Sequence, residues 1–192
     1  MSRHKRGMTL METIVASFLL GITCTLMMTF FVYALRQTQR NMLRQELIIG
    51  GEKIVDRVLA SYAPSRDTLL LANTSINGVL IPQASTVNSS KLVFDSSGNL
   101  VWSSWKAFGY DTTNRQVWQA WQAFVTPVTS GGELTTGPTT TSPANWTRKV
   151  IAKNVTLFSV TGPNNGVIRV RVILSDSSGY KVEIASSGDS LN

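Results

Sequence analysis

Residues 7–35 read GMTLMETIVASFLLGITCTLMMTFFVYAL, and this stretch decides how the chain is organised. Thr13–Leu35 is a run of 23 residues without a charge, long enough for a helix that crosses a bilayer. Glu12 stands at the entrance of this run, after a basic segment. An ionised side chain in the middle of a bilayer costs roughly 2.5–3.5 kcal/mol on insertion scales. We therefore expect a partner that compensates the charge of Glu12.

The order of these features differs from that of a secretory signal peptide. Such a peptide has a shorter apolar core, and its small-residue cleavage site follows the core. In this chain the core is longer and no Ala-x-Ala sequence closes it. Cleavage before the run, after Gly7, would instead make Met8 the new amino terminus, one helical turn from Glu12. We expect the carboxylate of Glu12 to pair with the new ammonium group of a neighbouring subunit.

The segment Gly7–Glu12 resembles the amino-terminal motif of the type IV pilin superfamily. In that family a prepilin peptidase cuts after the Gly, the new terminal residue is N-methylated, and a Glu occupies the fifth mature position. Met8 stands where the family usually has Phe. The resemblance implies cleavage between Gly7 and Met8, N-methylation of Met8, and filament assembly through Thr9, Leu10 and Glu12.

The resemblance also implies a division of the chain. Residues 1–7 are the expected leader peptide, 8–35 the transmembrane helix, 36–63 its amphipathic continuation and 64–192 a globular, β-rich extracytoplasmic domain. The expected location is a single pass through the inner or cell membrane, with the carboxy-terminal domain outside the cytoplasm and the chain incorporated in a pilus or pseudopilus.

Helical periodicity continues beyond the apolar run. Apolar residues recur three or four positions apart, at Leu43, Leu47, Ile48, Ile54, Val55, Val58, Leu59 and Tyr62. Pro64 is expected to end the helix. Gly50 and Gly51 interrupt the pattern, and two interpretations stay open: a kink or close packing against the domain, or a site that bends or melts on assembly. Gly21 allows the same two interpretations.

The remainder of the chain has the composition of strands and turns. The sequence Asp-Ser-Ser-Gly occurs at 95–98 and again at 176–179, each time between apolar runs, and predicts two hairpins. In 167–174 apolar residues alternate with arginines, which predicts a half-buried antiparallel strand. We interpret 117–125 as a strand and 129–145 as an exposed loop. The expected fold class is α+β, with a long amino-terminal helix packed on an antiparallel β-sheet domain.

The sequence offers little for catalysis, and we expect a protein that is not an enzyme. The one histidine, His4, lies in the expected leader, and the one cysteine, Cys24, precludes an intrachain disulfide. Asp176, Glu183 and Asp189 are not spaced as a calcium loop, and we expect them to be solvated surface charges. No cofactor and no metal are expected.

Five tryptophans raise the question of stacking on single-stranded DNA or sugars. Basic residues lie near them, at Lys106, Arg115, Arg148 and Lys149. Large aromatic side chains in a small β domain belong more often to the core, which we favour. The formal net charge of +7 is spread without a long basic run.

The resemblance of Gly7–Glu12 to the pilin motif, together with the expected fold, predicts a structural minor subunit, a pilin or pseudopilin, of a type IV pilus or a type II secretion-like filament. Its implied partners are other pilin or pseudopilin subunits, the prepilin peptidase, a membrane platform protein and an assembly ATPase. The alternative is a single-span membrane-anchored adhesin or a DNA-binding receptor of a competence system. An uncut leader, or binding to DNA that falls steeply with salt, would favour the alternative.

Overall fold

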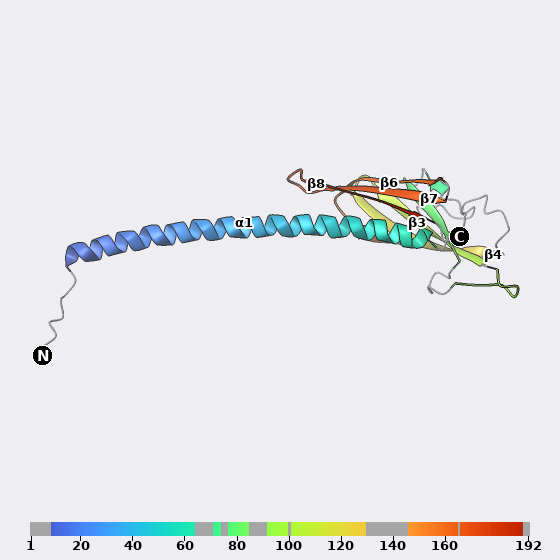
Figure 1. Cartoon of the computed structure of the whole chain (residues 1–192), viewed down its shortest axis with the longest axis horizontal. Helices are drawn as coiled ribbons and strands as arrows, with labels where there is room; N and C mark the ends of the chain where they lie inside the picture. Colours follow the sequence, from blue (N-terminus) through green and yellow to red (C-terminus); the bar gives the residue numbers. More distant parts are fainter. Residues whose placement is uncertain are drawn as a thin grey trace, which may run out of the picture. The chain divides into compact units, whose positions relative to one another are not determined.

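The computed structural model describes residues 9–63, 71–73, 77–84, 92–99, 101–129, 146–164 and 166–189. The chain divides into two compact units, Met1–Leu43 and Arg44–Asn192. One helix, α1 (Leu10–Tyr62, 53 residues), supplies most of the first unit and the opening segment of the second (Figure 1). It is continuous and ends two residues before Pro64, as the sequence predicts.

Among the described residues, eight strands follow the helix and form two antiparallel sheets. The first sheet has the order β1-β2-β3-β4-β5 and the second the order β6-β7-β8, so neighbours in each sheet are also neighbours along the chain. The strands are β1 (Leu71–Asn73), β2 (Gly78–Gln83), β3 (Val101–Asp111), β4 (Gln116–Thr129), β5 (Arg148–Ala152), β6 (Val155–Asn164), β7 (Val167–Ser175) and β8 (Lys181–Asp189). The predicted α+β class, with a helix on antiparallel sheets, is confirmed.

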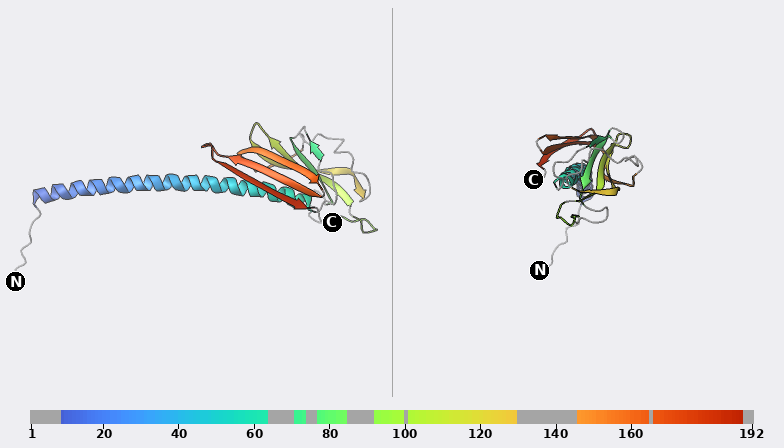
Figure 2. Two further views of the ribbon diagram at one scale, coloured as in Figure 1. Left: turned by 45° about the horizontal axis from the view of Figure 1, so that its top comes forward. Right: turned by 90° about the vertical axis from the view of Figure 1, so that its right-hand side faces the viewer.

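The carboxy-terminal part of α1 and both sheets share one core. The view along the helix in Figure 2 shows this part of α1 in the angle between the two sheets. The helix contributes Leu47, Ile54, Val55, Val58 and Tyr62 to the core, as its periodicity predicts. The hydroxyl of Tyr62 also donates a hydrogen bond of 2.9 Å to the carbonyl of Gly166, which ties the helix end to the β6–β7 turn.

Leu43 and Ile48 belong to the predicted apolar stripe but not to the core. Leu43 is 49% exposed and Ile48 is 39% exposed. The first buried residue of α1 is Leu47, one turn after Leu43. The stripe therefore begins about one turn before the part of the helix that the sheets cover.

Both Asp-Ser-Ser-Gly sequences form turns, as predicted. A carboxylate oxygen of Asp95 accepts hydrogen bonds of 2.8 Å from the backbone amides of Ser97 and Asn99. Asp176 holds Ser178 and Tyr180 in the same way, at 2.8 and 2.9 Å. The glycine that closes each turn has a positive φ, 81° and 84°, which is accessible to glycine at little cost.

The alternation in β7 gives the second sheet its two faces. Ile168, Val170, Val172 and Leu174 point into the core and are almost fully buried. Arg169 and Arg171 are on the opposite face and exposed. The predicted half-buried strand is confirmed.

The first sheet is buried on both faces. Val79, Ile81, Phe108 and Val117 face the shared core. A second cluster, on the other face, consists of Leu80, Trp105, Ala107, Trp118, Ala120 and Trp146. Residues 116–129 form β4, so the interpretation of 117–125 as a strand is confirmed. The predicted loop at 129–145 lies outside the described residues, apart from Thr129 at the end of β4.

The close packing of α1 against the second sheet explains why position 51 is a glycine. A Cβ atom added there would lie 2.6 Å from Cδ1 of Ile184 and 2.8 Å from Cδ1 of Leu174, closer than real Cβ atoms come to other atoms. A Cβ at Gly50 would meet Cβ of Ala152 at 3.4 Å, an ordinary contact. The helix passes through both glycines without a break, so of the two open interpretations, close packing against the domain describes Gly51.

Candidate functional site

Thr9 and Glu12 form a reciprocal cap at the start of α1. The backbone amide of Thr9 donates a hydrogen bond of 2.8 Å to Oε2 of Glu12, and the amide of Glu12 donates one of 3.3 Å to the hydroxyl of Thr9. The Thr9 hydroxyl is also 3.1 Å from the same Oε2. This is a capping box, in which two amides that the helix itself leaves unpaired are satisfied by side chains.

The capping box gives Glu12 a partner inside its own chain, which the sequence analysis missed. Its signal was present, because Thr-x-x-Glu before an apolar run is a known signature of a helix start. A carboxylate in the first turn is further favoured by the positive end of the helix dipole. Of the other predicted assembly residues, Leu10 begins α1 and is exposed. Gly7 and Met8, the predicted cleavage and methylation positions, lie outside the described residues.

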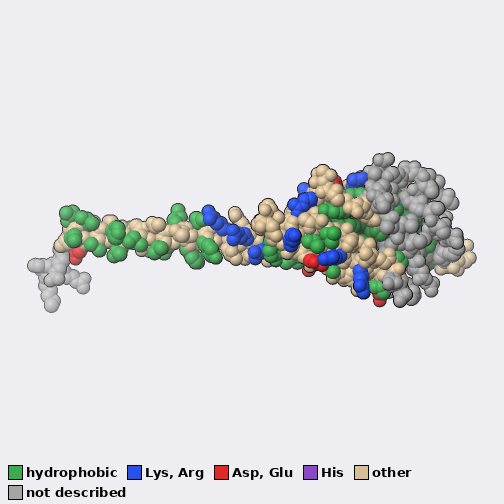
Figure 3. Space-filling model, turned by 90° about the horizontal axis from the view of Figure 1, so that it is seen from above, with side chains coloured by type: hydrophobic (Ala, Val, Ile, Leu, Met, Phe, Trp, Pro, Cys, Tyr) green, Lys and Arg blue, Asp and Glu red, His purple; other side chains and the backbone are tan. Residues whose placement is uncertain are grey.

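The first part of α1 presents apolar side chains to its surroundings. By length and composition the helix could cross a membrane, and none of its most apolar 18-residue window is buried. Figure 3 shows green apolar and tan uncharged side chains along this part, with Lys and Arg appearing further on. Exposed residues such as Phe18, Leu26 and Phe30 need an apolar environment or a protein partner. This supports a single amino-terminal membrane anchor.

The serine and threonine hydroxyl groups of the apolar segment are satisfied within the helix. Each donates a hydrogen bond of 2.8–3.2 Å to the carbonyl four residues earlier; the residues are Thr13, Ser17, Thr23, Thr25 and Thr29. An unpaired hydroxyl in an apolar medium would cost several kcal/mol. None of these five hydroxyl groups would therefore be unpaired in lipid.

Small residues recur every four positions along the same segment, in a row that winds slowly around the helix. We call this row the small-residue stripe; it consists of Thr13, Ser17, Gly21, Thr25 and Thr29. A shallow groove of about 500 Å³ lies on it, lined by Ser17, Phe18, Gly21, Ile22, Thr25 and Leu26. A Cβ added at Gly21 would have no atom within 4 Å. Stripes of this kind allow helices to approach closely in membranes. The repeat is legible in the sequence, but Gly21 taken alone does not predict it.

A polar cluster lies at the carboxy-terminal end of α1. Nζ of Lys106, from β3, donates a hydrogen bond of 2.6 Å to the hydroxyl of Ser61. Nε2 of Gln83, from β2, donates one of 2.8 Å to the carbonyl of Ser61. The last turn of α1 contains no basic residue of its own, so Lys106 supplies the positive charge that the end of a helix favours. Nζ also lies 4.5 Å from the centre of the Trp121 ring.

Lys106 should make the stability of the domain depend on pH. Burial, with a smaller contribution from repulsion by Arg57, lowers the pKa of Lys106 from 10.5 to about 8. Between these two values the unfolded chain keeps a proton that the folded chain has lost, so the free energy of unfolding should rise with pH. We expect the thermal midpoint to increase from about pH 7.5 to about pH 10 for the wild type, by more than for Lys106→Met.

The measurement is thermal unfolding of the full chain in detergent micelles, followed by tryptophan fluorescence. Lys149, an exposed lysine on β5, supplies the control Lys149→Met. That variant should keep the pH dependence of the wild type. Equal pH dependence in the wild type and Lys106→Met would show that Lys106 keeps its proton throughout this range.

The described residues contain no group of three His, Cys, Asp or Glu side chains that could hold a metal ion. Glu183 pairs with Arg171 at 2.7 Å, and Asp176 is engaged in its turn. Four of the tryptophans, Trp102, Trp105, Trp118 and Trp146, are at least 94% buried. These four rings therefore belong to the core, as the composition of the domain favours. They are not exposed for stacking on a nucleic acid.

The geometry places three features in the first part of the chain: a capped carboxylate, an apolar helix long enough to span a membrane, and a small-residue stripe along it. An antiparallel β domain follows, and the whole order of elements is compatible with a pilin-like fold. Compared with models of protein families, with curated proteins and with solved structures, the chain matches none of them.

Proposed function

We propose that this chain is a structural subunit, a minor pilin or pseudopilin, of a type IV pilus or a type II secretion-like filament. Prepilin peptidase removes residues 1–7, Met8 becomes the N-methylated terminus, and the chain assembles through α1. Its partners are other pilin or pseudopilin subunits, together with the platform protein and ATPase that build the filament. The β domain lies outside the cytoplasm.

The observation that carries this proposal is the position of Glu12. The carboxylate lies in the first turn of an apolar helix, four residues after the proposed new terminus, and its only described hydrogen-bond partner is Thr9. One carboxylate accepts up to about four hydrogen bonds, so Oε1 and part of Oε2 are left for a partner. A protonated amine at Met8 of an adjoining subunit supplies donors and the opposite charge.

The test is the amino-terminal mass of the protein in the membrane fraction. Mass spectrometry should find a product that begins at methylated Met8 in cells with prepilin peptidase, and the full-length chain in cells without it. Gly7→Leu should stop the cleavage, because the bulky side chain replaces the Gly that the peptidase recognises, whereas Gly7→Ala should be cut in part. A wild-type product that retains residues 1–7 would contradict the proposal and favour an uncut single-span receptor or adhesin.

The small-residue stripe predicts a second result. Gly21→Leu should lower incorporation into filaments, because the added side chain fills the groove against which a neighbouring α1 would pack. Thr23→Leu is the matched control, since Thr23 is exposed and lies outside the stripe. The measurement is the amount of each variant in sheared filament fractions relative to its amount in the membrane. Equal incorporation of the two variants would show that this face of the helix is not used.

A further inference from the structure

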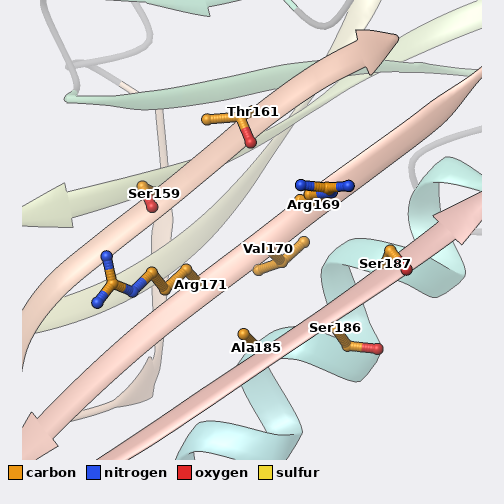
Figure 4. Close-up of a pocket in the computed structure, with 8 residues that line it drawn as sticks. All are labelled: Ser159, Thr161, Arg169, Val170, Arg171, Ala185, Ser186 and Ser187. Atoms are coloured by element: carbon orange, nitrogen blue, oxygen red, sulfur yellow. The ribbon is translucent and has the colours of Figure 1, made fainter. Parts of the chain in front are cut away.

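The outer face of the second sheet carries a trough of about 450 Å³ that the proposed function does not use. Figure 4 shows two arginines of β7 in its floor, between small side chains of β6 and β8. The residues that matter here are Arg169, Arg171, Ser159, Thr161, Ala185 and Ser187. In the register of the sheet, Arg169 lies between Thr161 and Ser187, and Arg171 lies between Ser159 and Ala185.

The two arginines are available for a partner. Both are exposed, and no ion pair with another described residue engages Arg169. Arg171 pairs with Glu183 at 2.7 Å, but both side chains are about half exposed, at 52% and 51%. Such an exposed pair is worth at most about 1 kcal/mol and exchanges partners readily. The trough is therefore a cationic surface without a fixed counter-charge at Arg169.

A complementary surface lies on α1 in the same unit. Glu52 and Asp56 are exposed, four residues apart, and hence on one side of the helix. Ile49, 62% exposed, stands between them and the exposed Glu46. Lys53 and the half-buried Arg57 lie beside these carboxylates, so three acidic side chains stand against two basic ones and the net charge of this side of the helix is negative by one. We call it the acidic stripe, defined by Glu46, Glu52 and Asp56.

We infer that the trough receives the acidic stripe of a second copy of this chain. The dimensions of the trough and of the acidic stripe agree. Two residues along a strand span about 7 Å, close to the roughly 6 Å between residues four apart in a helix, so Arg169 and Arg171 match Glu52 and Asp56 in spacing. The strands that border the trough, β6 and β8, are about 10 Å apart, which is the width of a helix. The small side chains on both borders leave room for a helix above the guanidinium groups of Arg169 and Arg171.

The contact joins different molecules. The inner face of the second sheet packs on α1 through Val170, Val172 and Leu174, so the trough opens on the side away from the helix. Glu52 and Asp56 of the acidic stripe lie on the side of α1 opposite its core residues Ile54 and Val58. The two surfaces face away from each other, and each copy offers one of each. Contacts of this heterologous kind generate open filaments unless the rotation closes a ring. The inference thus rests on the proposed function and names one contact within the filament.

Site-directed cross-linking in membranes tests the contact. In a Cys24→Ser background, a chain with Ile49→Cys and a differently tagged chain with Ala185→Cys are expressed together and oxidised. A mixed disulfide dimer is expected, since Ile49 would lie over the trough. The matched control pairs Ile49→Cys with Lys153→Cys, whose side chain is exposed in the β5–β6 turn outside the trough. Absence of the mixed dimer, or its formation to equal extent in the control, would overturn the inference.

Charge reversal provides an independent measurement. Arg169→Glu with Arg171→Glu should reduce the cross-linked product about tenfold or more, as should Glu52→Arg with Asp56→Arg, because like charges then face each other. All four changes in one chain should restore the product. Lys149→Glu with Lys153→Glu alters the net charge by the same amount as the arginine pair and should have no effect. If the charge reversals remove the cross-linked product and the chain with all four changes does not restore it, the trough binds a different acidic partner. That result would overturn the assignment to a second copy.

These results are distinguishable from failure of the proposed function. A mature chain that begins at Met8 but forms no mixed dimer would leave the pilin proposal standing and remove this contact. A chain that keeps residues 1–7 yet shows charge-dependent mixed dimers would do the reverse.

Discussion

Glu12→Ala should abolish incorporation into filaments while leaving cleavage after Gly7 intact. In the proposed filament the amine of Met8 would lie in apolar surroundings, and removing its partner would leave one unpaired charge. Breaking a buried ion pair in this way costs about 3–5 kcal/mol, which corresponds to a loss on the order of a hundredfold or more in the equilibrium constant for assembly. The measurement is the ratio of the variant in sheared filaments to that in the membrane, with mass spectrometry of its amino terminus.

The capping box makes a sharper set of variants possible. Glu12→Gln keeps a side-chain oxygen that can accept a hydrogen bond from the amide of Thr9, but it removes the charge. Thr9→Val keeps the charge and removes the hydroxyl that accepts from Glu12, at a cost of about 1 kcal/mol to the helix start. We expect Glu12→Gln to fail like Glu12→Ala, and Thr9→Val to assemble. Normal assembly of Glu12→Gln would show that Glu12 serves only as a cap and would remove the argument for an intersubunit ion pair.

Local signals in the sequence were sufficient for much of the fold. Alternation in β7, the two Asp-Ser-Ser-Gly turns and Pro64 after α1 each act over a few residues, and the structure agrees with each. The two features missed at the start of α1 were local as well. The capping box and the four-residue repeat of small side chains each lie within a short segment, but the charge of Glu12 alone and Gly21 alone do not predict them.

Other features depend on contacts between distant segments and could not be read from local patterns. In the sequence Lys106 is only a basic residue near tryptophans. Its partial burial follows from the register of three strands, which places it opposite Ile81 and Trp121 and within reach of Ser61. The trough likewise arises because Arg169 happens to align with Thr161 and Ser187. Register is a property of the paired strands, so no single segment contains it.

Gly51→Val should strongly destabilise the packing of α1 on the second sheet. The side chain would have to displace both Ile184 and Leu174, which pack against the helix at 2.6 and 2.8 Å from the position of a Cβ. Overpacking of a core costs about 1–3 kcal/mol, and we expect a loss near 3 kcal/mol in the free energy of unfolding because the buried Leu174 and the partly buried Ile184 must move together. Gly51→Ala should lose less, since the gain of about 1 kcal/mol in helix propensity offsets part of the strain.

Gly50 supplies the internal control, because it has the same backbone conformation and a neighbour in ordinary contact. Gly50→Ala places its Cβ 3.4 Å from that of Ala152 and should raise the free energy of unfolding by up to about 1 kcal/mol through helix propensity. Denaturant unfolding of the full chain in micelles, followed by the fluorescence of the buried tryptophans, measures both variants. If Gly50→Ala raises the free energy of unfolding and Gly51→Val lowers it, the glycine at position 51 is required for the close approach of α1 to the second sheet. If both substitutions stabilise the chain, the helix must be able to shift away from Ile184, and α1 would be held to the domain by Tyr62 and the residues near it.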